Sequence, residues 1–335
     1  MTHSTLAIIG DGAMGTVCAL MLAENGHDVC LWSAFPEAAR ELAQTRENRR
    51  FLPGHALDSR IRIARSDAEP FDGVEMVFSA VPTQFMRGVW QRLAAHCPAG
   101  LSVCSVTKGI ENATLLRPTQ ILCDVLDAGR DGRALAALSG PSIAPEVARG
   151  LPASVAVAAS DDALADRVQA LLNRPYFRIY TNSDLVGLEI AGAAKNVIAI
   201  AAGILDGLHA GDNAKAALVT RGLAEIARLG QSAGGRAETF FGLAGVGDLI
   251  TTCTSPIGRN RCFGQAVGQG ATAEQAQAQA HGVVEGVATT VSLVQLARRL
   301  GVEMPITQAV HDILFEHRPP DQAIAQLMAR PLKAE

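Results

Sequence analysis

The six residues GDGAMG, from Gly10 to Gly15, constrain the fold more than any other stretch of the chain. They follow an apolar segment over 6–10, which we interpret as a strand, and they lead into residues 16–27, where apolar side chains recur at helical spacing. A second apolar strand follows over 28–32. The pattern G-x-G-x-x-G at such a junction is typical of a dinucleotide-binding unit.

Each glycine of this motif has a physical role in that interpretation. Gly10 permits the turn, Gly12 lets a pyrophosphate approach the backbone, and Gly15 lets the helix pack closely on the strand. The helix N-terminus that follows the motif then faces the anion. A purely structural turn is the alternative, because glycines are common in tight strand-to-helix connections. We expect a dinucleotide site, with NAD or NADP as the cofactor.

The rest of the chain predicts an α/β fold with a separate helical part. Strands are expected at 74–82, 101–109, 134–141 and 154–159, with helices over 84–96 and around 114–127, and this alternation is typical of a parallel, doubly wound Rossmann-type sheet. Beyond 182–184 only helical stretches are expected: 185–208, 213–232, 260–268, 272–280, 287–300, 306–316 and 321–329. The predicted domains are therefore a dinucleotide-binding domain over 1–183 and an all-helical domain for substrate binding and catalysis over 184–335.

The end of the second strand is where such folds distinguish NAD from NADP. An acidic residue there binds the ribose 2′-hydroxyl, and an arginine suits a 2′-phosphate. The chain has Ser33, Ala34 and Phe35 at this point, while Glu37 and Arg40 come slightly too late. The choice between NAD and NADP stays open, and we expect modest discrimination.

Composition limits the classes of partner. The 335 residues are 48% hydrophobic with a net charge of −4, which gives no reason to expect nucleic acid or an anionic membrane as partner. The seven cysteines show no spacing typical of a zinc site or a disulfide framework, so we expect reduced thiols and no metal. The apolar stretch at the N-terminus is too short for a signal peptide, so the cytoplasm is the expected location.

Lys195 stands in the middle of the most apolar stretch, EIAGAAKNVIAIAAGI over 189–204. A membrane span is disfavoured, because a central lysine costs roughly 2.5–3.5 kcal/mol on insertion. The lysine could snorkel to the edge of a buried helix. However, its neighbours from Ala191 to Ala194 are small and leave room beside the ammonium for a ligand.

Residues 242–264, GLAGVGDLITTCTSPIGRNRCFG, contain many glycines and are expected to form a loop. An ordinary surface loop with solvated charges is one interpretation. The other is a ligand site, because Asp248 lies among apolar residues and Arg259 can present a guanidinium fork to a phosphate beside Asn260. Glu285, considered by itself, is interpreted as an ordinary carboxylate at the start of a helix.

Taken together, these segments resemble the bacterial-type NAD(P)-dependent sn-glycerol-3-phosphate dehydrogenases over nearly the whole chain. The resemblance is carried by GDGAMGT (10–16), Val81–Pro82, TKG (107–109), SGPSIAPE (139–146), AKNVIAIAAG (194–203), VTRGLAE (219–225), GLAGVGDL (242–249), GRNRCFG (258–264) and VVEG (283–286). That family interconverts dihydroxyacetone phosphate and sn-glycerol 3-phosphate, the backbone of phospholipids. It also implies a homodimer.

The resemblance assigns roles to individual residues. It implies that Lys195 is the catalytic acid/base, assisted by Lys108 and Asp248. Contacts to a phosphorylated substrate are implied for Lys108, Gly140, Ser142, Lys195, Asn196, Asp248, Gly258, Arg259 and Asn260. Contacts to the cofactor are implied for Gly10, Gly12, Ala13, Met14, Gly15, Ala34, Phe35, Lys108, Ala144, Arg259, Val283 and Glu285. The chain departs from the family pattern at Gly258, often a serine, and at Ala34 and Phe35, often polar or basic.

Two other functions are compatible with the sequence. A dehydrogenase of the 3-hydroxy acid or ketopantoate type also joins a nucleotide domain to a helical domain with an active lysine. A nucleotide-binding sensor without turnover is the second alternative. Chemistry favours catalysis, because a buried ammonium can stabilise the negative charge that hydride transfer places on a carbonyl oxygen and can deliver the proton.

Overall fold

The computed structural model describes residues 3–127, 132–280 and 282–331. The chain divides into two compact units. The first comprises 1–108 and 116–189, and the second comprises 109–115 and 190–335. The last of these boundaries, after Glu189, falls inside the long helix α7 (Leu185–Gly207).

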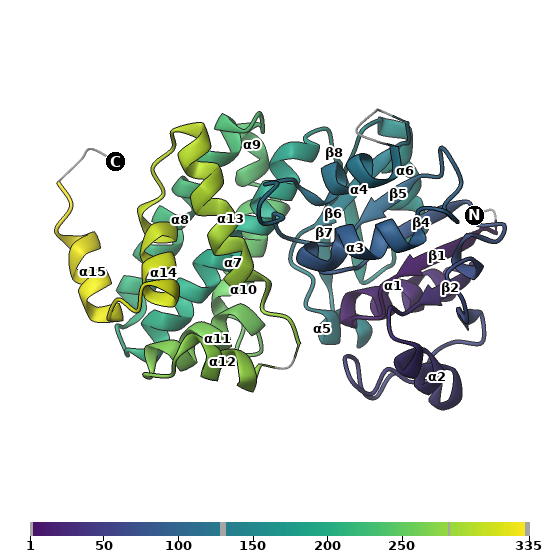
Figure 1. The fold of residues 1–335 in the computed structure, drawn as a ribbon, viewed down its shortest axis with the longest axis horizontal. Coiled ribbons are helices and arrows are strands. Elements are labelled where there is room, and N and C mark those ends of the chain that lie inside the picture. The colour runs from purple at the N-terminus through teal and green to yellow at the C-terminus, as the bar shows by residue number, and fades with distance from the viewer. Residues whose placement is uncertain (1–2, 128–131, 281, 332–335) are drawn as a thin grey trace. The chain divides into compact units, whose positions relative to one another are not determined.

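The first unit is built on one sheet of eight strands in the order β3-β2-β1-β4-β5-β6-β7-β8 (Figure 1). The strands are β1 (Thr5–Ile9), β2 (Asp28–Trp32), β3 (Ile61–Ile63), β4 (Met76–Ser79), β5 (Val103–Ser105), β6 (Leu135–Ser139), β7 (Ala153–Ala159) and β8 (Phe177–Asn182). Neighbours from β3 to β6 pair in parallel, and β8 is parallel to β7. The predicted α/β doubly wound architecture is confirmed.

The expectation of a wholly parallel sheet is wrong at one pair, because β6 and β7 run antiparallel. The connection between them holds only the five-residue helix α5 (Ala144–Ala148). Such a helix rises about 8 Å, whereas a five-residue strand is about 16 Å long. The chain therefore reverses beside β6 instead of returning to its starting edge.

Two strands were not expected from the sequence. β3 has only three residues, which is too short for a periodic signal. β8 begins with alternating buried and exposed side chains, from buried Phe177 to exposed Tyr180. This period of two is the signal for an edge strand with one buried face.

Helices cover both faces of the sheet (Figure 1). Leu6 and Ile8 of β1 belong to the core that includes side chains of α1 and α6, while Ala7 and Ile9 belong to the core that includes α3 and α4. The remaining elements of this unit are α1 (Ala13–Glu24), α2 (Pro36–Thr45), the short 3-10 helix η1 (Glu69–Phe71), α3 (Thr83–Leu93), α4 (Pro118–Asp127) and α6 (Asp162–Leu172). This alternation of side-chain direction along β1 follows from the pleat of a strand.

The second unit is helical, and its helices are α7 (Leu185–Gly207), α8 (Asp212–Ser232), α9 (Ala237–Phe240), a π-helical turn η2 (Leu243–Gly247), α10 (Asp248–Thr254), α11 (Arg259–Gly268), α12 (Ala273–Gln279), α13 (Glu285–Leu300), α14 (Pro305–Phe315) and α15 (Pro320–Met328). Each helical stretch expected from the sequence is present. Among the described residues, α7 alone is long and apolar enough to cross a membrane, and the apolar part of it is entirely buried within the protein.

Candidate functional site

The GDGAMG segment over 10–15 forms the glycine-rich loop that joins β1 to α1, as the motif predicts. Gly10 has φ +110°, and a Cβ there would lie 2.8 Å from the Ala80 carbonyl oxygen. A Cβ on Gly15 would lie 2.1 Å from the carbonyl oxygen of Gly10, whereas one on Gly12 would meet no atom within 4 Å. Two glycines are therefore required by packing, and the third leaves open space at the N-cap of α1.

The first turn of α1 carries no acidic side chain. Ala13 and Met14 therefore contribute main-chain N–H groups and the positive end of the helix dipole, with no neighbouring carboxylate on that turn. Open space above glycine next to a helix N-terminus fits the pyrophosphate of a dinucleotide. The loop residues thus suit NAD or NADP, whose nicotinamide ring supplies the hydride when bound.

The end of β2 presents an exposed aromatic ring. Phe35 is 62% exposed, and Ala34 is half-buried. Phe85, in the first turn of α3 after β4, is also exposed at 57%. Exposed phenylalanine rings therefore lie in the segments that follow both β2 and β4.

Lys108, Gly140 and Ser142 come together after β5 and β6. The Lys108 Nζ donates to the Gly140 carbonyl oxygen at 3.0 Å, and the Ser142 hydroxyl donates to the same oxygen at 3.1 Å. Gly140 has φ +142°, and a Cβ there would lie 2.8 Å from Val155 Cα, so other residues are excluded. Ala144 begins α5 a few residues later. Lys108 and Ser142 therefore meet at the Gly140 carbonyl oxygen, and Ala144 follows them in sequence.

Lys195 is buried, with 6% of its surface exposed, at the middle of α7. Its Nζ donates to Asp248 Oδ1 at 2.8 Å and to Thr252 Oγ1 at 2.7 Å. The side chain does not snorkel to solvent. A buried ammonium held by one carboxylate and one hydroxyl has a fixed direction, which is what a proton donor needs.

The expectation of a loop over 242–264 is wrong for most of its length, because only 255–258 separate helical segments there and Arg259 already begins α11. Leu243–Gly247 form a π-helical turn, and Asp248–Thr254 form the α-helix α10. The glycines there serve close packing instead of flexibility, since a Cβ on Gly245 would lie 2.0 Å from the Phe240 carbonyl oxygen. On a helix, residues four apart share a face.

That helical spacing explains why Asp248 and Thr252 both reach Lys195. Thr252 is one of the polar residues of the segment predicted as a loop, and a loop gives no reason to pair it with Asp248. The i, i+4 spacing would have identified it once the segment had been assigned as a helix. The contact of Thr252 with Lys195 is thus the feature of this unit that the loop prediction could not provide.

A second polar junction links α7, α11 and α13. The Asn260 amide donates to Asn196 Oδ1 at 3.0 Å, and the Gly286 N–H donates to Asn260 Oδ1 at 2.9 Å. Gly258 is the N-cap of α11, and Arg259 is its first residue. Each donor and acceptor here fixes one helix end against another.

Arg259 reaches across to the segment before α13. Its Nη1 donates to the Val283 carbonyl oxygen at 2.8 Å, and Glu285 begins α13 two residues later. The N-termini of α11 and α13 therefore bring together five predicted site residues: Gly258, Arg259, Asn260, Val283 and Glu285. Helix N-termini with an adjacent arginine bind anions well, and a phosphate fits this chemistry.

The close approach of α7 and α11 has a sequence cause. A Cβ on Gly203 of α7 would lie 2.0 Å from the Arg261 carbonyl oxygen, and one on Gly264 of α11 would lie 2.0 Å from the Ile200 carbonyl oxygen. Asp206 adds an ion pair between the helices, with its Oδ2 2.6 Å from Arg261 Nη2. This crossing fixes the helix that carries Arg259 and Asn260 against the helix that carries Lys195 and Asn196.

Glu225, at the end of the segment VTRGLAE, does not join these clusters. Its carboxylate accepts the N–H groups of Ile306 at 2.7 Å and Thr307 at 3.3 Å, and it therefore caps the N-terminus of α14. Burial raises the pKa of Glu225 to about 7. Its role in this structure is to hold two helices together.

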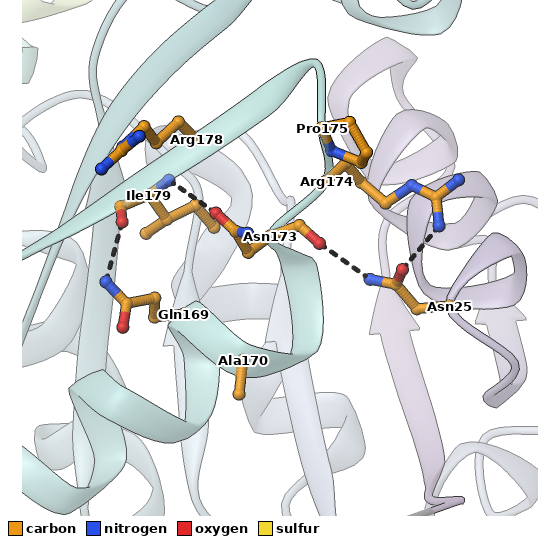
Figure 2. A pocket seen from close by; sticks show the side chains of 8 residues that line it. All are labelled: Asn25, Gln169, Ala170, Asn173, Arg174, Pro175, Arg178 and Ile179. Atoms are coloured by element: carbon orange, nitrogen blue, oxygen red, sulfur yellow. Dashed lines mark hydrogen bonds between the residues drawn. The ribbon is translucent and has the colours of Figure 1, made fainter. Parts of the chain in front are cut away.

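A cavity of about 800 Å³ in the first unit has none of the predicted site residues in its lining (Figure 2). It is lined by the ends of α1 and α6 and the start of β8: Asn25, Gln169, Ala170, Asn173, Arg174, Pro175, Arg178 and Ile179. Figure 2 shows the Asn25 amide bonded to both Asn173 and Arg174, and the Gln169 amide bonded to Ile179. The polar groups bond mainly to one another and to main chain, and they do not converge on one point.

Within the described part of the chain, one group of side chains has the spacing of metal ligands: His311, Asp312 and Glu316. Asp312 already accepts a hydrogen bond from Gln308 at 2.7 Å and pairs with Arg318 at 2.8 Å. These protein partners neutralise the carboxylate, so the cluster is explained by ion pairing.

Comparison with protein families matches both parts of the chain. Residues 5–165 match the family model described as the NAD-dependent glycerol-3-phosphate dehydrogenase N-terminus, and residues 184–325 match the model for the C-terminus of the same family.

Individual relatives agree over nearly the full length. The chain is 47% identical to a glycerol-3-phosphate dehydrogenase (NAD(P)+) of Geobacter sp. strain M21, covering 98% of both chains. It is 44% identical to the protein of the same name from Corynebacterium glutamicum, covering 99% of both. Among solved structures, glycerol-3-phosphate dehydrogenase from Coxiella burnetii matches with a TM-score of 0.94 and 37% identity, covering 98% of this chain and 99% of that one.

Proposed function

The chain belongs to the NAD-dependent glycerol-3-phosphate dehydrogenase family, and we propose that it reduces dihydroxyacetone phosphate reversibly to sn-glycerol 3-phosphate with NADH or NADPH. The observation that carries this proposal is the buried ammonium of Lys195, held by Asp248 and Thr252 on a helix of small residues. An ammonium with a fixed direction is what a proton donor needs, which supports the proposal. The product serves glycerophospholipid synthesis.

In this proposal Lys195 is the acid/base. In the reducing direction a hydride adds to the ketone carbon, and Lys195 donates a proton to the oxygen as negative charge develops there. In the oxidising direction the neutral amine takes the proton back from the hydroxyl. Asp248 and Thr252 orient the Nζ, so little reorganisation is needed when the proton moves.

The two parts of the chain have separate tasks in this proposal. Residues 1–183 bind the dinucleotide, through the glycine-rich loop, Ala34, Phe35 and Ala144, with Lys108, Gly140 and Ser142 contacting the substrate. Residues 184–335 carry the acid/base and bind substrate phosphate through Arg259, helped by Asn196, Gly258 and Asn260. Val283 and Glu285 contribute to cofactor binding. Arginine suits the phosphate because its fork can donate two parallel hydrogen bonds.

A substrate panel tests the function. The protein is mixed with NADH or NADPH and dihydroxyacetone phosphate, and nicotinamide absorbance is followed, with ketopantoate and 3-oxo acids in parallel. Catalytic loss of absorbance with dihydroxyacetone phosphate alone supports the proposal. Turnover of the other acids instead would favour the related dehydrogenases, and binding of nucleotide with no turnover would favour a sensor.

We also propose an oligomeric state and a cellular location for the enzyme. The family resemblance supports a homodimer working in the cytoplasm on a small phosphorylated substrate, and net charge offers no attraction to nucleic acid. Light scattering coupled to size-exclusion chromatography tests the dimer. A monomer at micromolar concentration would contradict it.

A further inference from the structure

The carboxyl end of β2 has no charged side chain of its own to recognise a ribose 2′-group. Ala34 and Phe35 are apolar, and the Ser33 hydroxyl bonds with the main chain of Phe35. This is the position at which dinucleotide folds distinguish a 2′-hydroxyl from a 2′-phosphate. A charged group that recognises it must come from another part of the first unit.

Arg92, in the last turn of α3, reaches this position. Its Nη1 donates to the Ala34 carbonyl oxygen at 3.1 Å. Its guanidinium carbon lies 5.1 Å from the centroid of the Trp32 ring, the last residue of β2. A residue 58 positions further along the chain therefore places a cation at the end of the second strand.

Asp67 holds this guanidinium from one side. Its Oδ2 is 2.7 Å from Arg92 Nε, and its Oδ1 is 2.7 Å from Arg92 Nη2. Trp32 Nε1 also donates to Oδ1 at 3.1 Å. These hydrogen bonds, chiefly those from Arg92, lower the pKa of Asp67, so the carboxylate is ionised and the pair is close to neutral.

The guanidinium keeps donors for a ligand. Arginine has five N–H groups, and the bonds to Asp67 and Ala34 use three of them. Two N–H groups, one on each terminal nitrogen, thus have no partner in the described chain. The side chain is 45% exposed, so an anion can reach them.

We propose that Arg92 recognises the 2′-phosphate of NADP(H) and that Asp67 opposes it, so that this pair sets the cofactor preference of the enzyme. The inference rests on the proposed function, since it needs a dinucleotide at the glycine-rich loop. Arg92 supplies the positive charge that the apolar residues Ala34 and Phe35 do not have. The carboxylate repels the phosphate and accepts hydrogen bonds from ribose hydroxyls, which favours NADH.

Opposite substitutions have opposite effects in this arrangement. Arg92→Leu removes the cation, and Asp67→Asn removes the opposing charge while an acceptor oxygen stays beside Arg92. Because the parent pair is nearly neutral, we expect a parental preference between the two nucleotides below about a thousandfold, or about 4 kcal/mol.

Isothermal titration calorimetry with NADH, NADPH, AMP and adenosine 2′,5′-bisphosphate at one salt concentration tests this. Arg92→Leu should raise the Kd of NADPH at least about tenfold, equal to about 1.4 kcal/mol, and leave that of NADH within about twofold. Asp67→Asn should lower the Kd of NADPH at least about threefold. The bisphosphate should follow NADPH, and AMP should follow NADH.

Two further variants keep the result interpretable. Arg92→Lys retains the charge, so it should recover part of the NADPH affinity if folding is intact, which thermal unfolding checks. Arg40→Leu is the matched control, because Arg40 follows the same strand but pairs with Glu37 at 3.2 Å. Equal losses for both nucleotides in Arg92→Leu, or an NADPH-selective loss in Arg40→Leu, would overturn the assignment. Failure of the parent to bind either nucleotide would overturn the proposed function itself.

Discussion

The Nζ of Lys195 lies 2.8 Å from Oδ1 of Asp248, and both side chains are almost fully buried. Two opposite charges that are buried together depend on each other, because removing one leaves the other desolvated and without its counter-charge. The same contact fixes the direction of the ammonium, which in the proposed function is the proton donor. Stability and catalysis can therefore be separated by substituting each partner.

Lys195→Met keeps the length and apolar packing of the side chain and removes the ammonium. We expect a folded protein that still binds NADH but loses at least about a thousandfold in kcat, since proton delivery and oxyanion stabilisation disappear together. Stopped-flow measurement of single turnovers checks the chemical step. A variant that retains more than about a tenth of parental kcat would exclude Lys195 as the acid/base, and Lys108 would be tested next.

Asp248→Asn leaves the Lys195 ammonium buried without its counter-charge. We expect a loss of about 3–5 kcal/mol in the free energy of unfolding, the usual cost of breaking a buried pair. The double variant Lys195→Met/Asp248→Asn should recover much of this loss, because no unpaired charge is left. Urea unfolding of all four proteins measures the coupling, and additive losses would show that the two residues do not interact in solution.

Arg259→Ala tests the phosphate contact. We expect at least about a hundredfold loss in kcat/KM for dihydroxyacetone phosphate, or about 2.7 kcal/mol, with the fold intact. Unphosphorylated dihydroxyacetone is the control substrate, and Arg178→Ala, an exposed arginine of the first unit, is the control variant. An equal loss on both substrates would place Arg259 away from the phosphate.

Glu225 gives the protein a pH-dependent stability. Its pKa is about 7 in the folded state against an ordinary value of 4.5, so the folded protein binds the extra proton between these values. The unfolding free energy contributed by this group therefore falls as pH rises from 4.5 to 7 and is then constant. The total change is on the order of 3 kcal/mol.

Glu225→Gln should remove this dependence. We expect its stability relative to the parent to improve between pH 5 and pH 8, measured by urea unfolding at each pH. Glu238→Gln, an exposed carboxylate of the same unit, is the control and should show no such trend. If parent and Glu225→Gln lose stability in parallel over this range, the buried carboxylate is not the titrating group.

Local patterns in the sequence were sufficient for most of the fold. Strand–helix alternation and the GDGAMG junction predicted the sheet and the loop, and the apolar period predicted α7 with Lys195 at its centre. These signals are local, so no knowledge of packing was needed. The antiparallel pairing of β7 and the three-residue strand β3 depend on connection length and on neighbouring strands, which no short window of sequence contains.

The interior of the candidate site was less predictable for a related reason. Gly245 and its neighbours were interpreted as loop residues, because glycine weakens an isolated helix. In the structure Gly245 lies in a π-helical turn, where a Cβ would lie 2.0 Å from the Phe240 carbonyl oxygen, so the close backbone approach within this turn requires the glycine. The contacts of Thr252 with Lys195 and of Arg92 with Ala34 were not predicted, because the partners are distant in sequence.

The crossing of α7 and α11 provides the last prediction. Gly264→Ala would place a Cβ 2.0 Å from the Ile200 carbonyl oxygen, which only a shift of the two helices can relieve. We expect destabilisation by about 1–3 kcal/mol, the usual range for overpacking, and a rise in KM for dihydroxyacetone phosphate because Arg259 and Asn260 move with α11. Gly88→Ala in α3 is the matched control, since a Cβ there meets no atom within 4 Å and alanine should stabilise that helix by about 0.5–1 kcal/mol. Thermal unfolding and steady-state kinetics of both variants decide the matter: if Gly264→Ala were as stable and as active as Gly88→Ala, close packing of these glycines would not position the phosphate-binding helix.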